Sequence, residues 1–272
     1  KVERMVKTLR AFGMDERANS IENNKQILEP EAFNAPRAWI EYINRIFGVL
    51  SGLFALLMLI LSFRFLKSKT KVFGWTALGF ILLLINAWLG SIVVATNLLP
   101  GIVSIHYLAA FLCIFSFIKA IHIDRNFKSN LDFTHVSKAL LYVYFILAFG
   151  VVLLGTYSRE LADILKSEGA HILNGELNYS AMGLGFAFHR YLPFVLLSIT
   201  IYLYLKVTAQ GLKPRLIMLV GLFIIAQLIL GAINIKWVLP PWSQTLHIFF
   251  GSTLPILIFI LLLLNKQWRN QP

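Results

Sequence analysis

The chain has 272 residues, of which 58% are hydrophobic and only 14% charged. A soluble domain carries about 25% charged residues, so this composition excludes an ordinary soluble enzyme, whose apolar surface could not be kept from water. The formal net charge of +12 would fit a nucleic-acid partner, but lysine and arginine also collect in the cytoplasmic loops of membrane proteins. We therefore expect a lipid bilayer, and no nucleic acid, around this chain.

The first 40 residues are polar and mixed in sign, without the apolar region of a signal peptide. Within this outer-side polar segment, residues 3–17 are expected to form a short helix. Seven apolar runs follow, each about 20 residues long, which is the length that crosses a bilayer core of about 30 Å. They cover 45–66, 73–97, 102–123, 138–157, 184–206, 215–235 and 245–264. Alternation of the β-barrel kind is absent, so the predicted fold class is an all-α integral membrane protein.

Positive charge gathers in every second loop. Basic clusters follow the first, third, fifth and last runs, namely Arg64, Lys67, Lys69 and Lys71; Arg125, Lys128 and Lys138; Lys206, Lys213 and Arg215; and Lys266 and Arg269. The loops between them, 98–101, 158–183 and 236–244, are poorer in positive charge. The positive-inside rule then places residues 1–40 outside and the C-terminus in the cytoplasm. We expect a multi-pass protein of a bacterial plasma membrane.

Two stretches of the chain match each other. The first contains Asn86-Ala-Trp-Leu-Gly90, Leu99-Pro100 and His106, and the second contains Gln227-Leu-Ile-Leu-Gly231, Leu239-Pro240 and His247. In both, the glycine precedes the histidine by 16 residues. Such a repeat predicts duplicated four-helix bundles with a pseudo-two-fold axis along the membrane normal, the first repeat spanning 41–131 and the second 132–272. Because the second repeat has an additional leading helix, 138–157, symmetry predicts an eighth span upstream of Lys1.

Three histidines lie within about two turns of the outer ends of their helices: His106, His189 and His247. Ionisable groups inside spans are costly and usually face a functional site, although each could be a hydrogen-bonded interfacial residue. Zinc would require further Cys, Asp or Glu ligands, whereas a b-type haem needs only two axial nitrogens from facing helices. We therefore predict that His189 and His247 bind haem iron. Arg190 and Arg159 are candidate partners of its propionates, or snorkel to lipid head groups.

The first repeat differs from the second at one of these positions. Asn44 stands where the second repeat has His189, and asparagine is a poor iron ligand, so only His106 is left to bind a haem iron there. Glu41, three residues before Asn44, shares its helix face; it is otherwise a solvated carboxylate at a helix N-terminus. A one-histidine pocket with a carboxylate suits a reactive haem or a haem that is the substrate, whereas a two-histidine pocket suits an electron carrier.

These motifs together resemble haem A synthase, the membrane enzyme of cytochrome oxidase assembly. The resemblance covers about residues 39–264 and rests on Trp39-Ile-Glu41-Tyr-Ile-Asn44-Arg45, Leu89-Gly90, Leu99-Pro100 with His106, Gly155-Thr-Tyr-Ser-Arg159, His189-Arg190, Leu230-Gly231, and Leu239-Pro240 with His247. It implies an eight-helix duplicated bundle that oxidises the C8 methyl of haem O to the formyl group of haem A, with haem b as cofactor in the second half.

The resemblance also assigns individual residues. His189 and His247 match the axial pair of haem b, His106 matches a histidine of the substrate pocket, and Glu41 matches its acidic residue. Asn44 departs from the family's histidine, which puts bis-histidine ligation of the substrate in doubt.

Glu41 is the expected proton acceptor or the group that stabilises a developing cation. Electrons are expected to leave through the second-half haem to an unknown acceptor. Haem O synthase, oxidase assembly proteins and a second copy of the chain are candidate partners. Two other functions remain open: a haem b electron-transfer protein that modifies nothing, and a transporter with a histidine-lined pathway.

Overall fold

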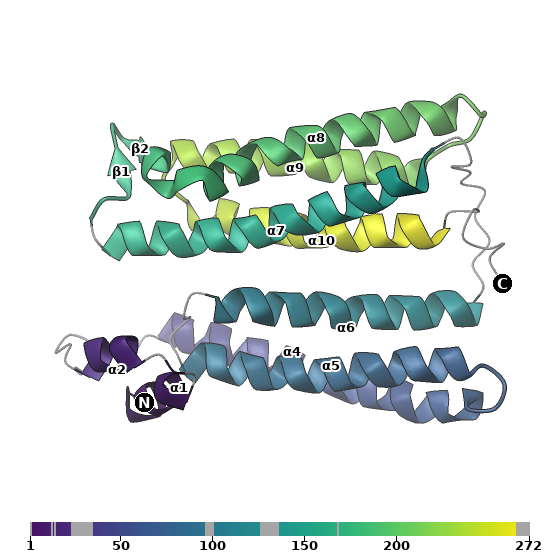
Figure 1. Cartoon of the computed structure of the whole chain (residues 1–272), viewed down its shortest axis with the longest axis horizontal. Coiled ribbons are helices and arrows are strands. Elements are labelled where there is room, and N and C mark those ends of the chain that lie inside the picture. Colours follow the sequence, from purple (N-terminus) through teal and green to yellow (C-terminus); the bar gives the residue numbers. More distant parts are fainter. Residues whose placement is uncertain are drawn as a thin grey trace. The chain divides into compact units, whose positions relative to one another are not determined.

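The computed structural model describes residues 2–11, 13, 15–22, 35–95, 101–125, 136–167 and 169–264. The chain divides into two compact units, Lys1–Asp124 and Arg125–Pro272, whose elements are labelled in Figure 1. The boundary predicted between the two repeats, after residue 131, falls in the segment 126–135, outside the described residues.

The first unit contains three long helices and two short ones. They are α1 (Val2–Ala11), α2 (Asp15–Glu22), α4 (Ala35–Ser62), α5 (Thr70–Ala95) and α6 (Ile102–Arg125), with a 3-10 turn at Phe63–Phe65. The single helix expected over residues 3–17 was wrong. Gly13 lies between α1 and α2 at φ +71°, a left-handed conformation that ends a helix and that glycine adopts without strain. The Arg10 guanidinium joins the two helices through a 2.7 Å ion pair with Glu22.

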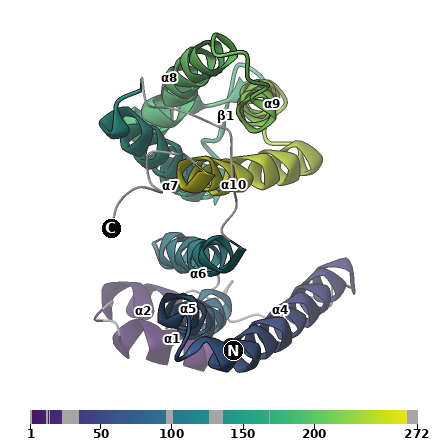
Figure 2. The ribbon, with the colours of Figure 1, turned by 90° about the vertical axis from the view of Figure 1, so that its right-hand side faces the viewer.

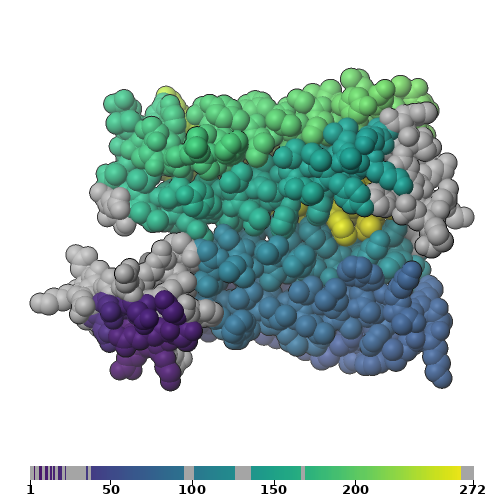
Figure 3. Space-filling model, viewed as in Figure 1, coloured from purple at the N-terminus to yellow at the C-terminus, as the bar shows by residue number. Residues whose placement is uncertain are grey.

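The second unit is a four-helix bundle with a small hairpin. Its helices are α7 (Lys138–Ser167), α8 (Gly183–Thr208), α9 (Arg215–Lys236) and α10 (Pro241–Leu264), and a 3-10 turn, Tyr179–Met182, precedes α8. Contacts of α7 with α8, α8 with α9, α9 with α10 and α10 with α7 close the bundle, as the end-on view of Figure 2 shows. The surfaces of α7 and α8, teal and green in Figure 3, adjoin each other.

The seven predicted spans are confirmed, because seven helices are long and apolar enough to cross a bilayer. The all-α membrane fold class is confirmed with them; the relation of the two units by a pseudo-two-fold axis stays a prediction. In the described part of the chain, the two-stranded hairpin of β1 (Ile172–Leu173) and β2 (Glu176–Leu177) is the exception to helix. Its register pairs Ile172 with Leu177 and Leu173 with Glu176.

The predicted end of one span, at residue 157, was too early, because α7 continues to Ser167. The additional turns are polar on one side, where Arg159 pairs with Asp163 at 2.5 Å in i,i+4 spacing. Their other side is apolar: Ala162 is buried in a cluster with Leu177, Met182 and Phe186. This amphipathic extension packs against the hairpin and the start of α8, so hydropathy alone did not reveal it.

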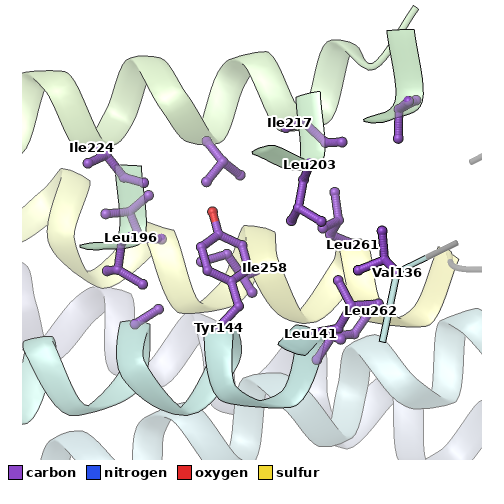
Figure 4. Packing of buried hydrophobic residues seen from close by; sticks show 14 residues of the cluster. Val136, Leu141, Tyr144, Leu196, Leu203, Ile217, Ile224, Ile258, Leu261 and Leu262 are labelled. Atoms are coloured by element: carbon purple, nitrogen blue, oxygen red, sulfur yellow. The ribbon is translucent and has the colours of Figure 1, made fainter. Parts of the chain in front are cut away.

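Hydrophobic side chains from all four helices fill the core of the second unit (Figure 4). One hydrogen bond crosses this core: the hydroxyl groups of Tyr144 on α7 and Thr200 on α8 lie 2.6 Å apart, and both residues are buried. Thr200 donates to the Leu196 carbonyl at 2.7 Å, so its oxygen accepts the proton of Tyr144. Buried polar groups in lipid must find such partners within the protein.

This bond predicts an ordered pair of stability effects. Thr200→Val keeps the shape but leaves the Tyr144 hydroxyl buried without a partner, which should cost about 1–2 kcal/mol. Tyr144→Phe removes the group that needs a partner and leaves Thr200 bonded to its own helix, so it should cost less. The measurement is unfolding of the purified full chain in detergent. A larger loss for Tyr144→Phe than for Thr200→Val would contradict this assignment of donor and acceptor.

Candidate functional site

His189 lies on α8, close to its N-terminal end, and its ring is held by α7. The ring nitrogen Nδ1 lies 2.9 Å from the backbone carbonyl oxygen of Val151. A carbonyl oxygen only accepts, so Nδ1 carries the hydrogen and donates it. The other ring nitrogen, Nε2, then keeps its lone pair and is the nitrogen available to a metal. Pro193, four residues further along α8, lacks the N–H that would bond the His189 carbonyl, which loosens the helix at this level.

Gly155 on α7 makes room for the His189 ring. A Cβ built on Gly155 would lie 2.9 Å from Cε1 and 3.3 Å from Nδ1 of His189, too close for any other residue without a shift of the ring. The same two helices interlock a second time, since a Cβ on Gly185 of α8 would lie 2.8 Å from the Tyr157 ring of α7. These reciprocal contacts fix the register of α7 against α8 at the level of His189.

His247 on α10 faces His189 across the second bundle. Their ring centroids lie 6.0 Å apart, and the ring planes cross at 79°. The backbone of His247 is tied to α9, because the Gln227 side-chain amide donates to the His247 carbonyl at 2.6 Å. Nδ1 of His247 is buried without a hydrogen-bond partner in the described part of the chain. Two imidazoles of different helices therefore meet inside one bundle, as the repeat predicted for their depth.

The spacing of the two rings fits one metal ion between them. Two imidazoles bonded to one ion at about 2.0–2.1 Å each, with a distance of about 1.2 Å from nitrogen to ring centre, place their centroids about 6.4 Å apart. The observed 6.0 Å is within about half an ångström of this value. Among the described residues, no group of three or more His, Cys, Asp or Glu could hold a metal, so the donor set suits a two-ligand haem iron better than zinc.

His106 has a similar setting in the first unit. It lies on α6, where a Cβ on Gly90 of α5 would come within 3.2 Å of its Cε1. The glycine and histidine of the repeat, predicted from their 16-residue spacing, are thus in contact here, as Gly231 and His247 are in the second unit at 3.6 Å. The neighbouring motif Leu99-Pro100 lies outside the described residues.

Glu41 lies on α4, which begins at Ala35 and so carries Glu41 and Asn44 on one helix, as their assignment to one face requires. The carboxylate accepts a hydrogen bond from Arg45 at 2.5 Å, and both side chains of this i,i+4 pair are exposed. Asn44 is exposed as well. The recorded partner of Glu41 is thus Arg45, and the described contacts do not join Glu41 to His106.

Arg190 and Arg159 are exposed near the outer end of the second bundle. The Arg190 guanidinium lies 5.1 Å from the ring centroid of Tyr179 and 5.6 Å from that of Tyr191. Arg159 is one helical turn beyond Gly155 and pairs with Asp163. Both arginines are therefore near the level of the His189 ring, with their present partners on the surface.

Two groups of this site were missed by sequence reasoning: Gly155 as the contact of His189, and the Val151 carbonyl as its hydrogen-bond acceptor. Gly155 stood inside a recognised motif, but its 34-residue separation from His189 differs from the 16 residues of the other two glycine–histidine pairs. The available signal was the dipeptide Leu-Gly, which occurs at Leu89, Leu154 and Leu230 near the same ends of three helices.

Comparison with known proteins adds a family to this geometry. The model of the COX15-CtaA family, described as cytochrome oxidase assembly protein, matches residues 14–260. No curated protein and no solved structure matches the chain. The match covers the seven spans almost completely, together with Glu41 and the three histidines of the two units. The chain therefore belongs to the COX15-CtaA family of cytochrome oxidase assembly proteins.

Proposed function

We propose that this protein is a haem A synthase, which oxidises the C8 methyl of haem O to a formyl group. The observation that carries the proposal is the facing pair His189 and His247, 6.0 Å apart inside one bundle. Together with membership of a cytochrome oxidase assembly family, this pair supports a resident b-type haem in the second unit. A haem bound there supplies a one-electron redox centre.

The residues of the second unit would hold that group in distinct ways. His189 offers Nε2 as ligand while Val151 holds the opposite nitrogen. His247 offers the second imidazole from a backbone position fixed by Gln227. Arg190 and Arg159 supply positive charge for the two propionates, and Arg159 would exchange its partner Asp163 for one of them. Gly155 and Gly231 let both rings approach their neighbouring helices closely.

The first unit would hold haem O as the substrate. His106, packed against Gly90, is its axial ligand in this proposal, and Glu41 takes a proton from the reacting methyl or stabilises positive charge that develops beside it. In the described structure Arg45 neutralises Glu41, so the carboxylate must leave this partner to act. The protein would work in a bacterial plasma membrane, with residues 1–40 outside and the C-terminus in the cytoplasm, consistent with the alternation of basic loops.

A haem b electron-transfer protein is the second candidate, favoured by two observations. Asn44 replaces the histidine of the family pattern, and Glu41 is exposed and paired with Arg45 rather than joined to His106. Both weaken the case for chemistry in the first unit while leaving the second-unit pair untouched.

Pigment analysis separates the two candidates. The full chain is produced in bacterial cells that make haem O but no haem A, and the extracted haems are identified by chromatography and mass spectrometry. We expect haem A in these cells and none in cells with the empty vector, together with haem b bound to the purified protein. Purified protein carrying haem b, from cells that retain only haem O, would establish the electron-transfer protein instead.

A further inference from the structure

Three histidine rings in this protein pack on helical glycines in the same way. A Cβ would lie 2.9 Å from Cε1 of His189 at Gly155, 3.2 Å from that of His106 at Gly90, and 3.6 Å from that of His247 at Gly231. In each case the nearest ring atom is Cε1, between the two nitrogens. The distances also rank the contacts: the first requires glycine, and the last is an ordinary van der Waals contact.

Each ring also lies beside the backbone of the residue four positions before its glycine. For His189 this is a hydrogen bond from Nδ1 to the Val151 carbonyl at 2.9 Å. The backbones of Asn86 and Gln227 interact with the rings of His106 and His247, although Nδ1 of neither ring makes a hydrogen bond of full geometry in the described part of the chain. Only the Val151 and Gly155 pair thus combines a closed hydrogen bond with a contact that excludes a Cβ.

Helix geometry explains the offset of four residues. Every Cα–Cβ bond in a helix tilts toward the N-terminus, so a side chain covers the turn that precedes it. The side chain of the residue at i+4 therefore shields the carbonyl of residue i from the side. A glycine at i+4 leaves that carbonyl open, and its second lone pair can accept from a donor on a neighbouring helix while the first serves the helix itself.

We infer that Gly155 is a positioning residue for the haem ligand His189: by leaving the Val151 carbonyl open, it sets both the tautomer and the rotation of the imidazole. This inference rests on the proposed haem-binding role of His189. The hydrogen at Nδ1 directs the lone pair to Nε2, and the fixed ring plane sets how the imidazole meets a metal orbital. A methyl group at residue 155 would push Cε1 away and break the bond to Val151.

A double-mutant cycle on the haem-free full chain tests the contact without any cofactor. Gly155→Ala should lower the Tm in detergent by about 5 °C, as a loss of roughly 1–2 kcal/mol would do in a chain of this size. In the His189→Ala background the clash is absent, and the same change should leave Tm equal or higher, because alanine favours helix over glycine. An equal loss of Tm in both backgrounds would overturn the contact.

A spectroscopic comparison on the haem-loaded protein tests the positioning. Low-spin ferric haem has electron paramagnetic resonance g-values that depend on the planes of its axial imidazoles. Gly155→Ala should shift the largest g-value or convert part of the haem to high spin. Gly150→Ala, on the same helix with nothing within 4 Å of a Cβ, should change neither the g-value nor the Tm.

Gly185→Ala is the matched control for tight packing between the same helices. Its Cβ would meet Tyr157 at 2.8 Å and not a histidine, so it should alter Tm and leave the g-values unchanged. Unchanged g-values in Gly155→Ala, or the same g-shift in Gly185→Ala, would overturn the positioning role. If the wild-type chain binds no haem, the proposed function fails, while the haem-free cycle still decides whether Gly155 and His189 are coupled.

Discussion

Replacing His189 with alanine is expected to abolish the low-spin haem spectrum of the purified protein. The imidazole is one of two facing rings in the second bundle, and its Nε2 is left free by the hydrogen bond of Nδ1 to Val151. With only His247 left, the iron would be five-coordinate and high-spin. Removing groups that merely support a metal ligand costs about 10–100-fold in affinity, so loss of the ligand itself should lower haem affinity at least about 100-fold. His247→Ala should act in the same way.

The measurements are the absorption spectrum and the ratio of haem to protein after purification. His122→Ala is the control, because this histidine lies near the opposite end of α6 in the first unit and should leave the second-unit haem unchanged. The His189→Ala/His247→Ala double variant should retain no second-unit haem. A full low-spin spectrum in either single variant would show that the facing rings are not the axial pair.

The seven spans and the depth of the histidines could be predicted from the sequence because both depend on local properties. An apolar run of about 20 residues can form only one kind of membrane element, and a rise of 1.5 Å per residue converts position along a helix into depth. The contact of Gly90 with His106 follows from the short connection between two consecutive helices, which brings residues equally far from the turn side by side.

Other features depend on tertiary packing and could not be read from the sequence. The last turns of α7 are too polar to resemble a span, and they are helical because Ala162 is buried against Leu177 and Phe186. The pairing of His189 with Gly155 crosses a hairpin of variable length, so no fixed spacing reveals it. Glu41 was expected beside His106, but its partner in the structure is Arg45; its role at a substrate pocket stays a prediction.

His106→Ala and Glu41→Gln are expected to stop the conversion of haem O while leaving the second-unit haem b in place. Both residues belong to the first unit, whereas His189 and His247 hold their haem within the second. A bis-histidine iron has no open position and can only pass electrons, so chemistry on a porphyrin methyl needs a separate pocket with a positioned charge. The exposed pair of Glu41 with Arg45 contributes only about 0.3–0.5 kcal/mol, so Glu41→Gln should not impair folding. The ratio of haem A to haem O in cells, measured beside the haem b content of the purified variant, therefore reports on the first-unit pocket.

Asn44→His sharpens the same test, because it restores the histidine of the family pattern on the helix that carries Glu41. If the substrate iron needs two histidines for conversion, this variant should raise the ratio of haem A to haem O above that of the unmodified chain. We expect no increase, since His106 and Glu41 are both retained and a single axial imidazole keeps one face of the iron open. An added imidazole would close that face and also compete with Arg45 for Glu41. Full conversion by His106→Ala or Glu41→Gln would refute the first-unit pocket, and a marked gain from Asn44→His would show that two axial histidines are required there.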